Sequence, residues 1–326
     1  MSKKTFQESF SINSQNYRVV ADFDFSDELF TPRSYNINHN FLLRKQVSNE
    51  NESEILICLE SQKSDLIISN IGSKKYKILG DFTTEPYQDN FTLQNSLFGI
   101  NGPLNRVILH SLEKDLSVIT LHACALMHSE SSKIVIGFGH SGSGKSVLIT
   151  SALDLGWELV ASEYVTISSS GTLYRGNCYD NISAKSVCYV EENLNRAILN
   201  RGDILSAPLL NKVFVDFSNY QVKEAEIPLK EKKLIIAFLG FGSSGYETGF
   251  KISDQAFLNR SLLQNASEKI LMPIIFRESL AGTGKLDGDY ITRTLFTKKL
   301  IDLSSDAVVL SGGVADFNSW IKRMTL

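Results

Sequence analysis

The chain has 326 residues, of which 43% are hydrophobic and 21% are charged, and it contains 6 prolines and 21 glycines. This composition is that of an ordinary globular protein and excludes a collagen, a coiled coil and a disordered tail. The length predicts either a large domain with a smaller one or two domains of similar size, and the formal net charge of −3 supplies no basic field for a nucleic-acid partner.

The cysteines and the apolar runs indicate the compartment. A chain of this length needs no disulfide framework, and CxxC spacing is missing from the four cysteines, Cys58, Cys124, Cys178 and Cys188. The first residues, MSKKTFQESF, lack the apolar stretch of a signal peptide, and no apolar run approaches the roughly 18 residues that span a bilayer. No histidine pairs with a cysteine at zinc-site spacing. We therefore expect a cytoplasmic protein without a structural metal or membrane contact.

The first hundred residues contain short runs of alternating or β-branched residues, at 17–20, 54–58, 66–69 and 75–79, separated by turns rich in Asn and Ser. Such runs predict strands, and we expect a small β-rich N-terminal domain over residues 1–100. Apolar residues then follow at helical spacing, at 104, 107, 108, 112 and 116. This spacing predicts a helix that leads into a second domain, 101–326.

The second domain alternates strands and helices. The pattern predicts a strand at 119–126, a polar turn, a strand at 134–138, a glycine-rich loop, a helix at 146–155 and a strand at 158–163. Further strands are predicted at 212–217 and 233–239, with helices at about 255–270 and 314–324. The predicted fold class is therefore α/β.

The glycine-rich loop carries the clearest chemical signal. Gly139-x-x-x-x-Gly144-Lys145-Ser146 fits the phosphate-loop template G-x-x-x-x-G-K-[ST] in full. Glycines allow positive φ angles and close approach to phosphate oxygens, and the N–H groups of the loop and of the following helix attract negative charge. Lys145 supplies a cation to the β- and γ-phosphates, and the Ser146 hydroxyl can ligate Mg²⁺. We expect the nucleotide to be bound by one continuous segment, Gly139, His140, Ser141, Gly142, Ser143, Gly144, Lys145, Ser146 and Val147.

Residues on both sides of the loop extend this signal. The stretches Leu121-His-Ala-Cys-Ala-Leu126, Gly139 to Ser146 and Leu155-Gly-Trp-Glu-Leu-Val-Ala-Ser-Glu-Tyr-Val165 together resemble the catalytic domain of HPr kinase/phosphorylase and its relatives. In that family a His-containing strand precedes the phosphate loop, and the helix after the loop ends in a Gly followed by a (L/V)-x-D-(D/E)-x-V strand. The resemblance covers roughly residues 119–168.

The resemblance implies a phosphate-loop domain with a mixed β-sheet, a fold shared with phosphoenolpyruvate carboxykinases. It implies that ATP and Mg²⁺ are used to phosphorylate a serine hydroxyl, and it makes a homo-oligomer plausible. Carried across, Gly139 to Ser146 would bind the nucleotide, and Ser146 and Glu163 would hold Mg²⁺. The catalytic positions would be His122, near the transferred phosphate, Lys145 and Ser162.

The chain departs from the family pattern at its first acidic position. Ser162 stands where the family has the Asp that accepts the hydroxyl proton, and a serine is a poor base. The later Glu-x-Arg-Gly signature is reduced to Leu173-Tyr-Arg-Gly176, so the chain resembles a divergent relative. Asp180 is a candidate replacement base if the chain folds it back. Arg277 and Arg293 are candidate cations for the transferred phosphate.

Three functions are compatible with these residues. The first is an ATP- and Mg²⁺-dependent kinase that phosphorylates a serine-type hydroxyl of a protein, a peptide or a small metabolite. The second is a nucleotide-binding regulatory protein in which Ser162 marks lost catalysis. The third is an ATPase or GTPase whose metal-binding acid is Asp216, after the apolar run 213–215, in place of Glu163. The chain has no guanine-reading Asn-Lys-x-Asp segment, which favours ATP over GTP.

Overall fold

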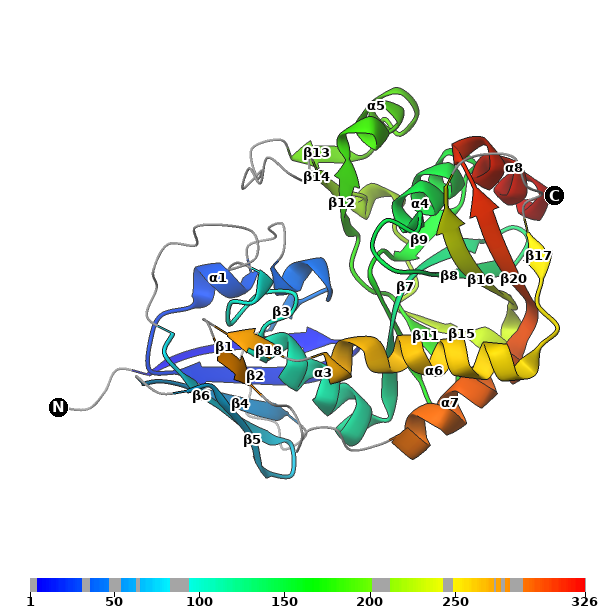
Figure 1. Ribbon diagram of the computed structural model, residues 1–326. Coiled ribbons are helices and arrows are strands. Elements are labelled where there is room, and N and C mark those ends of the chain that lie inside the picture. Colours follow the sequence, from blue (N-terminus) through cyan, green and yellow to red (C-terminus); the bar gives the residue numbers. More distant parts are fainter. Residues whose placement is uncertain are drawn as a thin grey trace. The chain divides into compact units, whose positions relative to one another are not determined.

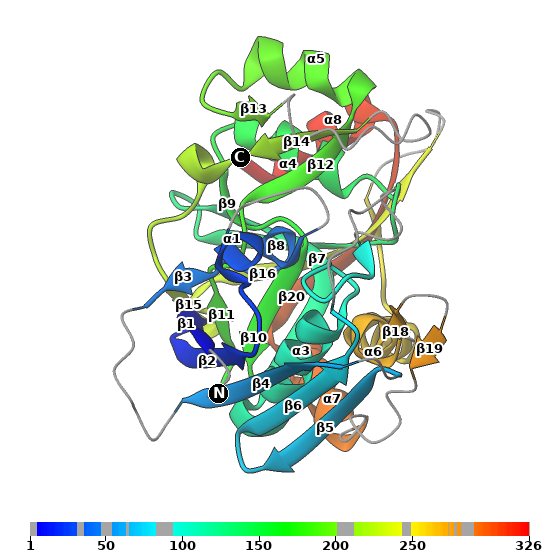
Figure 2. The same cartoon turned by 90° about the vertical axis from the view of Figure 1, so that its left-hand side faces the viewer.

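The computed structural model describes residues 5–30, 36–46, 54–62, 65–82, 94–200, 212–242, 249–272, 274–276, 279–281 and 290–325. The chain divides into two compact units (Figures 1 and 2). Unit 1 consists of Met1–Val118 and Glu268–Tyr290, and unit 2 consists of Ile119–Ser267 and Ile291–Leu326. Among the described residues, no helix is long and apolar enough to cross a membrane.

Unit 1 is built on a six-stranded sheet with strand order β3-β1-β2-β4-β6-β5. Its strands are β1 (Phe6–Ile12), β2 (Gln15–Ala21), β3 (Arg44–Lys45), β4 (Ile55–Ser61), β5 (Ile67–Gly72) and β6 (Lys75–Gly80). Strand β2 shows why these segments form a sheet, because Tyr17, Val19 and Ala21 are buried while the residues between them are partly exposed. Figure 2 shows β4, β6 and β5 side by side. The predicted β-rich N-terminal region is thus a sheet with parallel β2–β4 and β4–β6 pairs.

The described part of unit 1 also contains short helical segments, a longer helix and a small sheet. The helical segments are α1 (Ser26–Phe30), η1 (Ile37–His39) and α3 (Pro103–Leu116), and the two-stranded sheet pairs β18 (Ile274–Phe276) with β19 (Ser279–Ala281). Helix α3 is the helix predicted from the spacing of its apolar residues. It begins with a proline at its first position, and the residue after its last one, Ser117, has a left-handed conformation with φ of 54°.

The boundary between the units differs from the expected one at residue 100. The Tyr76 hydroxyl on β6 donates to Asp115 Oδ2 (2.6 Å), and the Tyr17 hydroxyl on β2 lies 3.1 Å from Ser111 Oγ. These contacts attach α3 to the sheet of unit 1, so the division falls after Val118. A segment from much later in the chain, Glu268–Tyr290, also belongs to unit 1. Helical spacing alone could not show which sheet the helix packs on.

Unit 2 contains a nine-stranded sheet with the order β15-β11-β10-β7-β8-β16-β20-β17, and β9 pairs with β7 off this path. The strands are β7 (Val118–His128), β8 (Lys133–Phe138), β9 (Glu158–Ala161), β10 (Tyr164–Ser168), β11 (Thr172–Tyr174), β15 (Glu226–Pro228), β16 (Lys233–Phe241), β17 (Phe250–Lys251) and β20 (Ser304–Gly312). Strand β16 is parallel to both β8 and β20, whereas β7 is antiparallel to β8. The predicted α/β class and the mixed sheet are confirmed.

Helices cover both faces of this sheet (Figure 1). On one face, α4 (Lys145–Asp154) and α8 (Val314–Thr325) pack on Cys124, Val135 and Ala237. On the other face, α6 (Gln255–Leu271) and α7 (Tyr290–Leu303) contribute to a core with Ala123 and Ile136. Successive residues of a strand point to opposite faces, so the central strands are apolar on both sides and read as nearly continuous hydrophobic runs.

The strand predicted at 212–217 is not part of the large sheet. It is β14 (Lys212–Asp216), which pairs with β12 (Tyr179–Ser183) and β13 (Ile198–Asn200) in a separate three-stranded sheet. Helix α5 (Ala184–Asn193) and the 3-10 helices η3 (Ser218–Tyr220) and η4 (Leu229–Glu231) complete the unit. The predicted strand at 158–163 ends earlier, at Ala161, which leaves Ser162 and Glu163 in the connection between β9 and β10.

Candidate functional site

The glycine-rich loop connects the end of β8 to the start of α4, as its sequence predicts. Gly142 and Gly144 have φ angles of 83° and 105°, which are unfavourable for a residue with a side chain. Gly139 is required for a different reason, since a Cβ at this position would lie 2.1 Å from Ser143 Oγ. The glycines therefore allow the loop to fold tightly over the N-terminus of α4.

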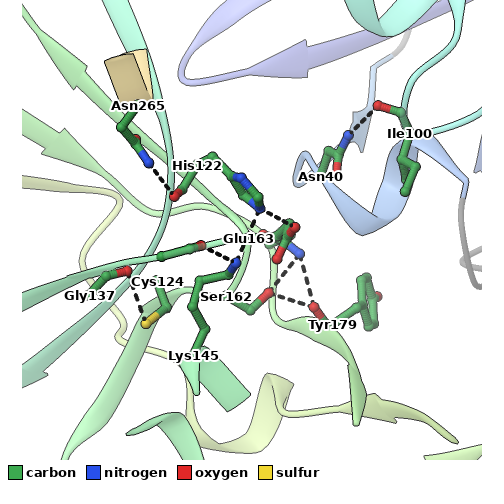
Figure 3. Close-up of polar contacts among 12 residues, drawn as sticks. Asn40, Ile100, His122, Cys124, Gly137, Lys145, Ser162, Glu163, Tyr179 and Asn265 are labelled. Atoms are coloured by element: carbon green, nitrogen blue, oxygen red, sulfur yellow. Dashed lines mark hydrogen bonds and ion pairs between the residues drawn. The ribbon is translucent and has the colours of Figure 1, made fainter. Parts of the chain in front are cut away.

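Lys145 is the first residue of α4 and is buried. Its Nζ donates a hydrogen bond to the carbonyl oxygen of Gly139 (2.9 Å) and lies 3.2 Å from His122 Nε2 (Figure 3). Ser146 and Val147 are partly exposed in the same helical turn, and His140 in the loop is exposed. An ammonium group beside a helix N-terminus is an arrangement that attracts an anion.

The register of three strands brings His122 and Glu163 to this loop. Ala123 on β7 pairs with Phe138, the last residue of β8. On its other side β7 pairs with β9, and beyond β9 the Ala123 N–H donates to the Glu163 carbonyl oxygen (3.1 Å). The start of the loop, His122 and Glu163 therefore lie at one level of the sheet. This convergence depends on strand pairing and could not be read from spacing along the chain.

His122 Nε2 forms a close pair with Glu163 Oε1 at 2.8 Å (Figure 3). The histidine side chain is buried, and the glutamate side chain is one-fifth exposed at 20%. The same ring nitrogen lies near Lys145, but it carries either one proton or one lone pair. It can donate to the carboxylate or accept from the ammonium, and not both at once. His122 is also held through its backbone, because the Asn265 side-chain amide on α6 donates to its carbonyl oxygen (2.9 Å).

The Ser162 hydroxyl both donates and accepts a hydrogen bond. Ser162 is buried, its hydroxyl donates to the Tyr179 carbonyl oxygen (2.5 Å), and it accepts from the Asn177 amide (2.8 Å). The Asn177 amide also reaches the Tyr179 carbonyl oxygen (3.1 Å). Ser162 thus connects Asn177 and the first residue of β12, Tyr179, to the end of β9. The Ser162 hydroxyl therefore helps to hold Asn177 and Tyr179 in place.

Asp180, which the sequence leaves unplaced, follows Tyr179 on β12 and is buried. Cys178 and Ile182, two residues before and after it, belong to the core that also contains Cys124 and α4. Burial raises the pKa of the Cys124 thiol to about 12, the charge of Lys145 opposes this increase, and Asp180 adds to it. The Asp180 carboxylate therefore lies within electrostatic reach of the same thiol as Lys145.

Other predicted residues lie elsewhere. Asp216 ends β14 in the three-stranded sheet, and its Oδ1 accepts from the Ser218 N–H (2.7 Å). It is therefore not at the end of a strand beside β8, as the ATPase hypothesis required. Arg293 is buried on α7, and Arg277 lies outside the described residues. Sequence reasoning missed Asn177 and Asn265, because no local motif marks them.

Two residues near the loop, Ser146 and Glu163, have side chains of the types that ligate Mg²⁺. Among the described residues, no group of three or more His, Cys, Asp or Glu side chains could hold a metal ion by itself. Mg²⁺ is usually bound by one or two carboxylates together with water and substrate phosphates. Glu163 and the Ser146 hydroxyl are donors of this kind.

Comparison with known proteins finds no match to a family model and no significant match to a curated protein. A functional assignment therefore rests on the residues and geometry of the site itself.

Proposed function

We propose that the protein is a phosphotransferase that uses ATP and Mg²⁺ to phosphorylate a serine-type hydroxyl of a protein, a peptide or a small metabolite. The observation that carries the proposal is the meeting of the glycine-rich loop, Lys145, His122 and Glu163 at one level of the sheet. The mixed sheet and the loop between β8 and α4 also support the resemblance to HPr kinase and its relatives.

Each residue of the site would have a different role in phosphoryl transfer. The loop N–H groups and the α4 N-terminus bind the phosphate chain, and Lys145 neutralises charge on the terminal phosphates. Ser146 and Glu163 would hold Mg²⁺, which supplies further charge neutralisation when bound. His122 Nε2 lies 2.8 Å from Glu163 Oε1, and this pair would keep the imidazole in place when Lys145 contacts a phosphate. The imidazole is then held in one orientation beside the transferred group.

The acceptor hydroxyl must lose a proton, and Ser162 is a poor base for it; its hydroxyl already donates to the Tyr179 carbonyl oxygen and accepts from the Asn177 amide. We propose Asp180 for this role, because it is a buried carboxylate next to Tyr179, whose carbonyl oxygen accepts a hydrogen bond from Ser162. An Asp180→Asn variant keeps the size of the side chain and removes its basicity. It should lose transfer by on the order of 10²–10⁴-fold and retain nucleotide affinity. Equal transfer by the variant and the natural protein would exclude Asp180 as the base.

The decisive experiment incubates the protein with γ-labelled ATP, Mg²⁺ and a panel of hydroxyl-bearing peptides and metabolites. Lys145→Ala should reduce transfer by on the order of 10²–10³-fold, the usual cost of removing a transition-state charge contact. Lys133→Ala is the matched control, because Lys133 lies at the opposite end of β8 and donates to the Met324 carbonyl oxygen. The control should retain transfer. Intact nucleotide binding with no transfer to any hydroxyl would refute the kinase proposal.

Nucleotide binding without transfer would favour the alternative function, a nucleotide-binding regulatory protein. The specific observation behind this alternative is that the Ser162 hydroxyl is buried and bonds to the Tyr179 carbonyl oxygen and the Asn177 amide. The substitution Ser162→Asp is a poor test, since it would set a carboxylate against the Tyr179 carbonyl oxygen, which now accepts at 2.5 Å. Asp180→Asn separates the two functions better. If the protein is a kinase, the variant should transfer less phosphate than the natural protein. If it is a regulatory protein, neither the natural protein nor the variant should transfer phosphate.

A further inference from the structure

An exposed aromatic side chain stands beside the glycine-rich loop, at the end of β16. Phe241 is 42% exposed, although residues 234–237 of the same strand are buried. Its backbone N–H donates to the Ser143 carbonyl oxygen in the loop (2.8 Å). A Cβ built on Gly144 would lie 3.0 Å from Phe241 Cβ. The ring is therefore attached to the loop and to the first turn of α4.

The ring is held on one side and open on another. It packs edge-on against Phe317 of α8, with ring centroids 5.9 Å apart and an interplanar angle of 78°. Phe317 is fully buried and fixes this edge. The neighbouring residue on the chain, Gly242, is exposed, and a Cβ built on it would meet no described atom within 4 Å. A flat ligand could therefore lie beside Phe241 without displacing a described side chain.

Phe241 also lies on the side of the loop where a nucleoside is expected. The strand order is β7-β8-β16-β20, with the loop at the end of β8. His122 and Glu163 come from the β7 side, where they meet Lys145 Nζ. A nucleotide whose terminal phosphate lies at these groups runs its phosphate chain across the loop. Its nucleoside then emerges on the β16 side.

We propose that Phe241 is the stacking surface for the base of the bound nucleotide, an inference that rests on the proposed nucleotide-dependent function. Every base has a π face, so an aromatic platform binds bases through stacking with little discrimination by hydrogen bonding. Purines offer a larger face than pyrimidines. This contact therefore selects a purine nucleoside triphosphate and does not distinguish adenine from guanine.

The experiment compares two ligands, ATP and inorganic triphosphate, each with Mg²⁺, by titration calorimetry. Phe241→Ala should weaken ATP binding by about five- to hundredfold, the usual range for one base-stacking contact. It should leave the affinity for inorganic triphosphate unchanged within about twofold, because that ligand has no base. Phe241→Tyr should retain the affinity for ATP. Phe250→Ala is the control, since Phe250 is similarly exposed at 51% but lies on the edge strand β17, opposite Val309.

Each other outcome has a distinct meaning. If Phe241→Ala binds ATP as tightly as the natural protein while Lys145→Ala does not, the base lies elsewhere and the proposed function stands. If Phe241→Ala loses ATP and triphosphate equally, the ring only supports the loop, and the stacking role is refuted. If the natural protein binds neither ligand, the nucleotide-dependent function itself fails.

Discussion

Gly139→Ala should destabilise the glycine-rich loop through a steric clash with Ser143, and one further substitution should relieve this clash. The added Cβ would lie 2.1 Å from Ser143 Oγ and 2.5 Å from Ser143 Cβ, whereas Cβ contacts below 3.0 Å essentially never occur. Rotating the Ser143 side chain can move Oγ, but the position of its Cβ is set by the backbone. The loop backbone must therefore shift. Overpacking of this kind typically costs about 1–3 kcal/mol.

Ser143→Gly in the same chain removes both clashing atoms. The Ser143 Oγ has no hydrogen-bond partner in the described part of the chain, and the loop contacts of Ser143 are made by its backbone N–H and carbonyl. Ser143→Gly alone should therefore cost only about 0.4–1 kcal/mol of chain entropy. The double variant should be more stable than the sum of the single changes predicts, by about 1–2 kcal/mol.

Urea unfolding of the four proteins in this double-mutant cycle measures the coupling, and triphosphate binding measures whether the loop recovers. Gly142→Ala is the control, because its φ of 83° makes it strained while a Cβ there meets nothing within 4 Å. Its cost of about 1–2 kcal/mol should not be relieved by Ser143→Gly. Additive effects of Gly139→Ala and Ser143→Gly would refute the steric explanation of Gly139.

Three other predictions concern Glu163, Cys124 and Arg106. Glu163→Gln keeps an acceptor for His122 Nε2, so it should change the free energy of unfolding by less than about 1 kcal/mol. It should lower Mg²⁺-dependent transfer by more than about tenfold. Loss of stability without loss of Mg²⁺ dependence would contradict the metal role. Burial raises the pKa of the Cys124 thiol from 9.0 to about 12. The contribution of this shift to the free energy of unfolding is therefore complete below pH 9. It is lost as the pH rises toward 12, by about 1.4 kcal/mol per pH unit. The urea midpoint should therefore fall between pH 8 and pH 10, and it should fall less in the Cys124→Ala variant. At pH 8 a thiol reagent should label the exposed Cys188 and should not label Cys124 until the protein unfolds. Arg106 is buried and donates to two backbone carbonyls at the C-terminal end of α6, so Arg106→Met should lower the free energy of unfolding by about 2–4 kcal/mol, and an unchanged urea midpoint would contradict this.

Local physics explains which parts of this protein could be predicted from sequence. The glycine-rich loop was found because its glycines and Lys145 act within a few residues of one another, and the structure gives each glycine a steric or conformational reason. The same holds for α3, whose apolar spacing and initial proline are local signals. The predicted alternation of strands and helices in the second half likewise depends on periodicity along the chain.

The tertiary structure decided everything that depends on strand pairing. The antiparallel register of β7 with β8 and β9 brings His122 and Glu163 to the loop, and the three-stranded sheet removes Asp216 from it. Packing attaches α3 to the first unit and buries Ser162 between Tyr179 and Asn177. The sequence therefore determined the glycine-rich loop, and long-range pairing decided which acids and aromatic rings lie near it. A one-residue slip of a strand would change those neighbours without altering any local pattern.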